Sequence, residues 1–213
     1  MLNDRKCLSS VSVSSKITLA LLGNYIRPIF LLFPMFLTIT SCGLKPTDVQ
    51  DASTEFNKAI VFDIDGTLTP NIISIYTARE NAARAVHFYA DNGYKIIYLS
   101  ARVKVFQFNI PYFIKHNGFP KGSIHVPQSS ADRDDFAAFK QRILERYQDK
   151  GWTLDAAYGD SSSDFEAYAA AGIRADSIYA IKRVGDKSCQ PGSWIKCLES
   201  WTEQLASLTD VAP

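Results

Sequence analysis

Short apolar runs alternate along the chain with longer segments in which apolar residues recur at helical spacing. The short runs 59–62, 95–99, 123–126, 154–158 and 177–181 are typical of buried strands. The segments between them predict helices over 76–92, 105–117, 135–147 and 164–171, with a break near Pro111 in the second. Strands that alternate with helices predict a Rossmann-like α/β fold, a doubly wound parallel sheet.

The beginning of the chain has a different pattern. Residues 17–40 are mostly apolar, but Asn24, Arg27, Pro28 and Pro34 interrupt them. The uncharged run that is left, 28–40, is short for a membrane-spanning helix, which needs about 20 residues. The pattern fits the apolar region of a secretory signal peptide better.

A possible lipidation site follows this apolar region. The sequence Ile39-Thr40-Ser41-Cys42 resembles the bacterial lipobox, in which the cysteine is acylated and becomes the mature N-terminus. The alternative is an uncleaved anchor that happens to contain a cysteine. Either interpretation exports the domain, and Gly43 after the cysteine favours a lipoprotein of the outer membrane that faces the periplasm, with the inner membrane left open.

These patterns divide the chain into four parts. We expect a signal peptide over 1–41, a polar tether over 42–57, the catalytic domain over 58–183 and an extension over 184–213. The extension contains Trp194 and Trp201 and forms either a helix packed on the sheet or a membrane-facing surface. Cys189 and Cys197 form either a disulfide bond, as export would allow, or two unpaired thiols.

Composition excludes several other classes of protein. The chain is 46% hydrophobic and 21% charged, which is ordinary for a globular protein and unlike a disordered one. The net charge is +1 and the basic residues are scattered, so no nucleic-acid surface is predicted. The three histidines are isolated and do not indicate a zinc site. Oligomeric state is not determined by the sequence.

Polar side chains directly follow three of the predicted strands. Asp63 and Asp65 come after the first, Ser100 after the second and Asp160 after the fourth. Because ligands of such sheets bind beyond the carboxyl ends of the strands, these residues are expected on one rim. Asp63 could attack a phosphorus atom, and Asp65 could protonate the leaving oxygen and then activate water.

Other side chains complete a site for phosphoryl transfer. Ser100 supplies a hydroxyl donor and Lys140 a positive charge for the transition state. Asp160 and Asp164 supply oxygen ligands of the kind that Mg²⁺ prefers. Taken singly, these residues could equally be helix caps or solvated surface groups. Their order and their positions after apolar strands favour catalysis.

The motifs resemble those of the haloacid dehalogenase superfamily. Asp63-Ile64-Asp65-Gly66-Thr67 matches its first motif, Ser100 the second, Lys140 the third and 159–164 the fourth. Within it, the chain is most similar to the lipin phosphatidate phosphatases and the related LNS2 domain of phosphatidylinositol-transfer proteins. Asp160 departs from the lipins, which usually carry Asn at that position.

The resemblance implies a set of site residues. Mg²⁺ would be bound by Asp63, by the main-chain carbonyl of Asp65, and by Asp160 or Asp164. Substrate would be bound by Gly66, Thr67, Ala101 and Arg102, although Arg102 could instead brace the loop through a salt bridge.

The intervals between the motifs leave no room for a large cap domain. An open site would admit a bulky phosphoester or a lipid headgroup at a membrane. The leading hypothesis is a membrane-tethered, Mg²⁺-dependent phosphatase that acts on a lipid phosphate such as phosphatidic acid. The alternatives are an exported acid phosphatase for soluble nucleotides or sugar phosphates, and a non-catalytic module that binds lipid phosphates.

Overall fold

The fold is built on one sheet in which all paired strands are parallel. The structure is a computed structural model that describes residues 43–210. The predicted signal peptide and Cys42 lie outside the described residues. The strand order is β3-β2-β1-β4-β5-β6, with β1 (Lys58–Asp63), β2 (Lys95–Leu99), β3 (Ser123–His125), β4 (Thr153–Gly159), β5 (Ile178–Ile181) and β6 (Lys196–Leu198). The predicted α/β fold class is confirmed.

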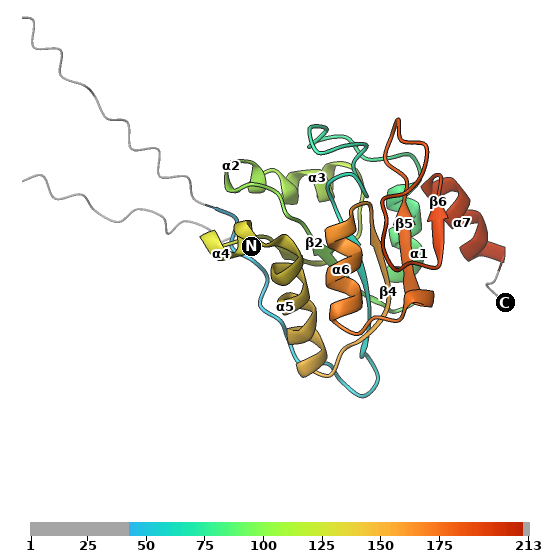
Figure 1. Cartoon of the computed structure of the whole chain (residues 1–213). Coiled ribbons are helices and arrows are strands. Elements are labelled where there is room, and N and C mark those ends of the chain that lie inside the picture. Colours follow the sequence, from blue (N-terminus) through green and yellow to red (C-terminus); the bar gives the residue numbers. More distant parts are fainter. Residues whose placement is uncertain (1–42, 211–213) are drawn as a thin grey trace, which may run out of the picture. The chain divides into compact units, whose positions relative to one another are not determined.

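Helices cover both faces of the sheet. One face packs against α1 (Ala82–Asp91), α3 (Ile110–His116) and α7 (Trp201–Asp210), and the other against α5 (Phe136–Asp149) and α6 (Ser162–Ala170). Figure 1 shows α5 and α6 on the near side and α1 behind. The remaining helical turns are α2 (Lys104–Gln107), α4 (Ser130–Asp134) and the 3₁₀ turn Ala175–Ser177.

The apolar run of β1 explains its central position. Ile60 and Phe62 point into the core beneath α1, whereas Ala59 and Val61 point into the core beneath α5. All four are buried, as a strand covered on both faces requires. The run therefore specifies an interior strand of a parallel sheet.

Strand register brings the polar motifs to one edge. Asp63 pairs with Leu99 of β2, and Phe62 pairs with Tyr158 of β4. Ser100 and Asp160 therefore follow their strands at the same end of the sheet as Asp63. In Figure 1 this is the upper end, where the loop after β1, helices α2 and α3, and the loop after β5 also lie.

Two of the predicted helices differ from what the sequence suggests, the first in where it begins and the second in where it is broken. The first starts at Ala82, because Asn81 has a left-handed backbone (φ 60°) that no helix interior accepts. The second is divided into α2 and α3 at Phe108 and Asn109, not at Pro111. Pro111 lies in the first turn of α3, where its missing N–H costs no hydrogen bond.

Residues 43–57 pack along the domain. The Thr47 N–H donates to the carbonyl of Ile124 in the edge strand β3, and Ala52 N–H donates to the carbonyl of Lys150. The indole of Trp152 donates to the carbonyl of Gln50. A segment that pairs with an edge strand protects it from other chains. These contacts hold the segment of the predicted tether that the structure describes against the domain, which composition does not reveal.

The extension after 183 is part of the domain. It contributes β6 to the sheet and α7 to one face, where Trp201 is fully buried and its indole donates to the carbonyl of Thr67. A disulfide joins Cys197 of β6 to Cys189 in the preceding loop, with 5.8 Å between the Cα atoms. Among residues 43–210, no helix combines the length and apolar character needed to cross a bilayer.

Candidate active site

Asp63 and Lys140 form the buried centre of the site. Asp63 is the last residue of β1, and the Lys140 ammonium reaches it from α5 with 2.5 Å between Nζ and Oδ1. Both side chains are nearly inaccessible to solvent. The other carboxylate oxygen of Asp63, Oδ2, is buried and has no hydrogen-bond partner among the described residues. Burying a carboxylate oxygen without a hydrogen-bond partner costs free energy unless a ligand binds to it.

Asp164 links Lys140 to a helix end. Its Oδ1 accepts a hydrogen bond from Lys140. Its Oδ2 accepts from the Ser161 hydroxyl at 2.8 Å and from the backbone N–H groups of Asp160 and Ser161. The Ser161 N–H bond, together with the bond from the Asp164 N–H to the Ser161 hydroxyl oxygen, forms the capping box of α6. Both oxygens of Asp164 are thus already engaged, which makes it a weaker candidate for a metal ligand than Asp63.

Asp160 lies against the turn that follows β1. Its Oδ1 accepts from the Thr67 hydroxyl at 3.3 Å, and its Oδ2 accepts from Nε of Arg183 at 2.6 Å. A Cβ atom on Gly66 would overlap Asp160 Oδ2, and Gly66 has φ +95°. Glycine is therefore required there, both for the turn and for the close approach of the carboxylate.

The three aspartates have the composition of a magnesium site. Each of Asp63, Asp160 and Asp164 offers one carboxylate oxygen, and these atoms lie within 4.8 Å of one another. The free Oδ2 of Asp63 and the oxygen-only donor set fit a hard divalent cation. Asp63 and Asp160 are the candidate ligands that do not also cap a helix.

The charges of this cluster are not balanced by protein alone. Burial raises the pKa of the Asp63 carboxyl well above its ordinary value; Lys140 opposes the shift, and the like charges of Asp164 and Asp160 add to it. Burial and Asp164 likewise raise the pKa of Asp160, while Arg183 opposes the shift. Excess negative charge of this kind is what a bound cation would relieve.

Asp65 belongs to a second, neighbouring set of contacts. Its Oδ2 accepts from the Ser100 hydroxyl at 2.6 Å, and its Oδ1 accepts from Nη2 and Nε of Arg102 at 2.6 and 3.0 Å. Arg102 Nη1 is buried and has no partner among the described residues. The structure therefore places Ser100 against Asp65, and Arg102 in a salt bridge that leaves one donor group free.

A cavity of about 570 Å³ opens above these residues. The buried or largely buried part of its lining, the floor, is polar and includes Asp63, Asp65, Lys140, Asp160 and Asp164, and the part-exposed Arg183 also lines it. Its walls are apolar and consist of Ile72, Ile73, Ile75, Val103, Phe106 and Phe136. Ala101 and Arg102 also line it, whereas Gly66, Thr67 and Ser100 are not among its lining residues. The predicted roles of these residues in binding substrate stay predictions.

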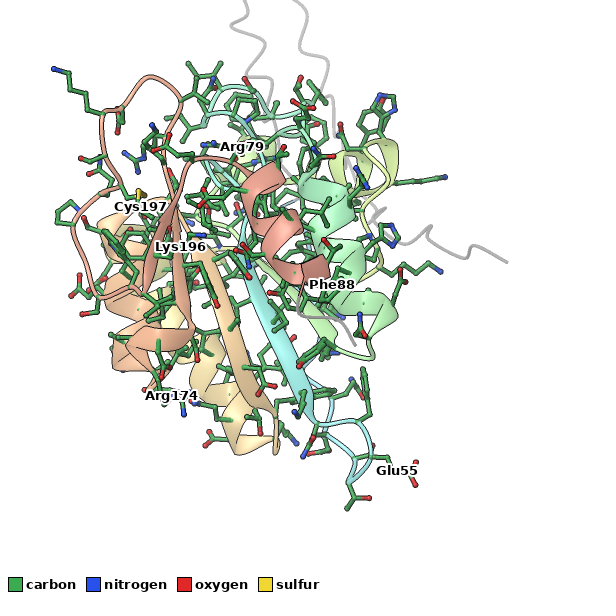
Figure 2. The ribbon with its side chains drawn as sticks, turned by 90° about the vertical axis from the view of Figure 1, so that its right-hand side faces the viewer. Glu55, Arg79, Phe88, Arg174, Lys196 and Cys197 are labelled. Carbon is green, nitrogen blue, oxygen red and sulfur yellow. A yellow bond between two sulfur atoms is a disulfide. The ribbon has the colours of Figure 1, made fainter. Side chains whose placement is uncertain are left out.

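Two arginines at the site were not singled out in the sequence. Arg183 follows β5 and reaches Asp160. Arg79 donates to three carbonyls, those of Gly66, Thr69 and Lys182, and so joins the loop after β1 to the end of β5. Figure 2 shows Arg79 at one end of the sheet, with Glu55 and Arg174 at the other. The position of Arg183, two residues after the last residue of a predicted strand, was the available signal. Nothing comparable marks Arg79.

Comparison with known families decides the assignment. The family model described as the LNS2 domain of PITM 1-3 matches residues 60–182, more than half of the chain. The chain belongs to the LNS2 domain family. The match runs from β1 almost to Arg183, so it includes every aspartate of the site and Lys140. The family predicted from the motifs is confirmed.

The LNS2 domain has relatives among characterised animal proteins. It is 29% identical over 136 residues to the protein retinal degeneration B of Drosophila melanogaster, covering 61% of this chain and 10% of that protein. It is 29% identical over 153 residues to the phosphatidate phosphatase LPIN2 of Mus musculus, covering 63% of this chain and 16% of that protein. The chain thus matches only a small part of each of these larger proteins.

A solved structure supports the fold. The structure of DsGPDH of Dunaliella salina superposes with a TM-score of 0.50 at 18% identity, covering 75% of this chain and 31% of that one. At such low identity the likeness concerns the fold alone.

Proposed function

We propose that this LNS2 domain is a Mg²⁺-dependent phosphatase that hydrolyses a phosphomonoester through an aspartyl-phosphate, with a lipid phosphate of the phosphatidic acid type as its substrate. The observation that carries the proposal is the two-sided cavity. Its floor holds an unpartnered carboxylate oxygen beside a buried lysine, and its walls are apolar. Such a site suits a phosphate group attached to an apolar body.

Asp63 is the nucleophile in this proposal. One oxygen of its carboxylate attacks phosphorus, which leaves the other for Lys140 and the cation, and the bond between phosphorus and the ester oxygen breaks. Asp65, which lines the cavity together with Asp63, enters this step as the protonated carboxylic acid, gives its proton to the leaving oxygen and becomes a carboxylate. The products of this half-reaction are the free alcohol and a phosphorylated Asp63.

The second half-reaction returns the site to its starting state. The ionised Asp65 takes a proton from water, whose oxygen attacks phosphorus and releases inorganic phosphate and Asp63. Asp65 is then protonated for the next cycle. Lys140 keeps a positive charge beside the reacting oxygens throughout, because Asp63 and Asp164 hold its ammonium in place.

Mg²⁺, bound by Asp63 and Asp160, would supply the positive charge that lets an anionic carboxylate approach an anionic phosphate. Arg102 has the contacts of a phosphate-binding side chain. Its buried Nη1 has no partner among residues 43–210 while its other nitrogens hold Asp65. A substrate phosphate would give Nη1 a hydrogen-bond acceptor, because a guanidinium group can donate two parallel hydrogen bonds to phosphate oxygens.

The predicted export signal belongs to the same proposal. We propose that Cys42 is acylated and holds the enzyme on a membrane facing the periplasm. Support comes from the Ile39-Thr40-Ser41-Cys42 pattern and from the disulfide between Cys189 and Cys197, since disulfide bonds persist in oxidising compartments.

Phosphate release by the full chain tests the proposed function. The chain, purified in detergent, is given phosphatidic acid in vesicles or a panel of soluble nucleotide and sugar phosphates, with Mg²⁺ or with a chelator. We expect Mg²⁺-dependent release, with kcat/KM roughly tenfold or more higher for the vesicles. Release from the soluble panel alone would assign a soluble substrate. Binding to anionic vesicles without release from any substrate would show a binding module and contradict the enzyme.

A further inference from the structure

Exposed apolar side chains gather at the mouth of the cavity. Ile73, Ile72 and Phe108 are 84%, 71% and 63% exposed, respectively. They belong to two segments, one in the loop after β1 and one at and after α2. We call the exposed apolar residues of these segments the apolar rim: Ile72, Ile73, Tyr76, Val103, Val105, Phe106, Phe108 and Tyr112. A patch of this kind on a soluble fold marks an interaction surface.

The two segments form one surface. The rings of Tyr76 and Tyr112 meet edge to face with 5.9 Å between their centroids, and the Tyr76 hydroxyl donates to Asn109 at 3.2 Å. Asn117 donates to the Tyr76 carbonyl at 2.9 Å. The loop after β1 is therefore fixed against α3, and the rim is a continuous part of the domain.

The rim continues into the catalytic cavity. Ile72, Ile73, Val103 and Phe106 are both exposed on the surface and part of the cavity wall. A molecule bound on the rim would therefore touch the entrance of the site.

The charge of the rim suits an anionic surface. Residues 70–76 and 103–112 contain a single charged side chain, Lys104, which is positive. Arg102 and Arg183 line the cavity just inside. Protein surfaces that lie in a lipid interface combine apolar side chains with adjacent positively charged ones.

The start of the described chain lies at the same place. A Cβ atom on Gly43 would be 3.0 Å from Cε of Lys104 in α2, so Gly43 lies against the rim helix. Leu44 packs against the core, and its carbonyl accepts from Gln128 at 3.1 Å, which fixes this part of the chain. Cys42, the predicted lipidation site, is the residue directly before Gly43.

We propose that the apolar rim docks onto a lipid bilayer, the same bilayer that an acyl chain on Cys42 would enter, so that the cavity opens at the membrane surface. A lipid phosphate could then reach Asp63 with its phosphate while its acyl chains remain among the rim and the bilayer. An acyl chain on Cys42 would hold the domain on a bilayer, and contact between the rim and that bilayer would then be intramolecular. The bilayer is therefore the expected occupant of the rim. The consequence for substrate rests on the proposed phosphatase, and the choice of the bilayer as occupant rests on the proposed acylation of Cys42.

Depth-dependent quenching tests the docking. The full chain is reconstituted into vesicles of phosphatidylcholine and phosphatidic acid that contain lipids with brominated acyl chains. Ile73→Trp places a fluorophore on the rim, and Ile195→Trp places the control at an exposed position whose N–H bonds to Ile178, at the opposite end of β5. We expect at least about a twofold loss of the added fluorescence in Ile73→Trp and little in Ile195→Trp. Equal quenching in the two variants would overturn the proposal.

Activity provides a second test that separates docking from chemistry. Val105→Ser and Phe108→Ser change exposed rim residues that do not line the cavity, and Ile195→Ser is the control. We expect the rim pair together to lower phosphate release from vesicles roughly tenfold and to leave release from a soluble phosphomonoester unchanged. An unchanged rate on vesicles would overturn the docking.

The remaining outcomes are distinct. If the chain releases no phosphate from any substrate, the proposed function fails, while the quenching still decides the docking. If sedimentation in detergent shows a dimer that Phe108→Ser dissociates, and the added fluorophore of Ile73→Trp is not quenched, the rim binds a second copy and the proposal is overturned.

Discussion

The Lys140 ammonium lies 2.5 Å from Oδ1 of Asp63, and the second oxygen of that carboxylate has no hydrogen-bond partner among the described residues. This relationship connects stability and chemistry at one point. The lysine, together with the helix cap formed by Asp164, orients the carboxylate so that the unpartnered oxygen is available to a ligand.

Replacing Lys140 tests the structural part of that relationship. Lys140→Met leaves Asp63 and Asp164 buried without their cation, and breaking a buried pair in this way costs about 3–5 kcal/mol of unfolding free energy. Urea denaturation measures the change. Lys150→Met, at the exposed end of the same helix, is the matched control and should change stability little. Equal effects of the two substitutions would show that the buried cluster does not depend on Lys140.

Gly66 tests the close approach of Asp160. In Gly66→Ala the new Cβ overlaps Asp160 Oδ2, and the backbone at φ +95° is strained as well. Gly93→Ala isolates the strain, because Gly93 has φ +80° and nothing within 4 Å of the new atom. We expect Gly93→Ala to cost about 1 kcal/mol and Gly66→Ala clearly more, measured as unfolding free energy. Equal losses would show that Asp160 moves away freely.

Arg183 is predicted to weaken metal binding. Its guanidinium occupies Asp160 Oδ2, a candidate metal ligand, and is part-exposed. Arg183→Ala should strengthen Mg²⁺ binding roughly two- to fivefold, the equivalent of about 0.4–1 kcal/mol for an ion pair at the surface. The rise of the unfolding temperature with Mg²⁺ concentration measures it. Lys187→Ala, an exposed change in the same loop, is the control. Weaker binding in Arg183→Ala would show that the arginine supports the site.

The buried imidazole of His125 should make the stability of the fold depend on pH. Burial, assisted by the charges of Arg146 and Lys95, lowers the pKa of His125 from 6.5 to about 4, and its Nε2 lies 2.7 Å from the Tyr147 hydroxyl. Between these values the unfolded chain binds a proton that the folded chain does not. Stability should therefore fall as pH falls from 6.5 to 4, by roughly 3 kcal/mol in all.

Unfolding free energies at a series of pH values measure this dependence. His125→Gln replaces the imidazole by an amide, which can still bond to Tyr147 but does not titrate. The unfolding free energy of this variant should vary less between pH 6.5 and 4. His87→Gln, a change of a half-exposed histidine, should retain the wild-type dependence. An unaltered profile in His125→Gln would assign the pH dependence to other groups.

Much of the fold was predictable because its strands are buried on both faces. The runs at β1 and β2 are continuous and apolar, and the run at β4 is interrupted only by Asp155, which identifies interior strands from the sequence. The edge strand β6 could not be found in this way. It has three residues, and its position depends on pairing with β5 and on the neighbouring disulfide.

The site was predictable to the extent that its residues follow strands. Asp63, Ser100 and Asp160 lie at one edge because their strands are parallel and in register. The contacts between side chains were not predictable. Ser100 and Arg102 hold Asp65, and Arg79 joins two loops that are far apart in the sequence. These contacts depend on loop conformations that no local pattern encodes.

The central claim is that Asp63 is the nucleophile of a phosphatase, and phosphate release by Asp63→Asn tests it most directly. The substitution keeps the shape of the side chain but removes the charge that would attack phosphorus. With phosphatidic acid vesicles and Mg²⁺, and with unfolding measurements to establish that the variant is folded, we predict release at least about 10³-fold slower than in the wild-type protein. Release by a folded Asp63→Asn variant at a rate close to that of the wild type would contradict the account.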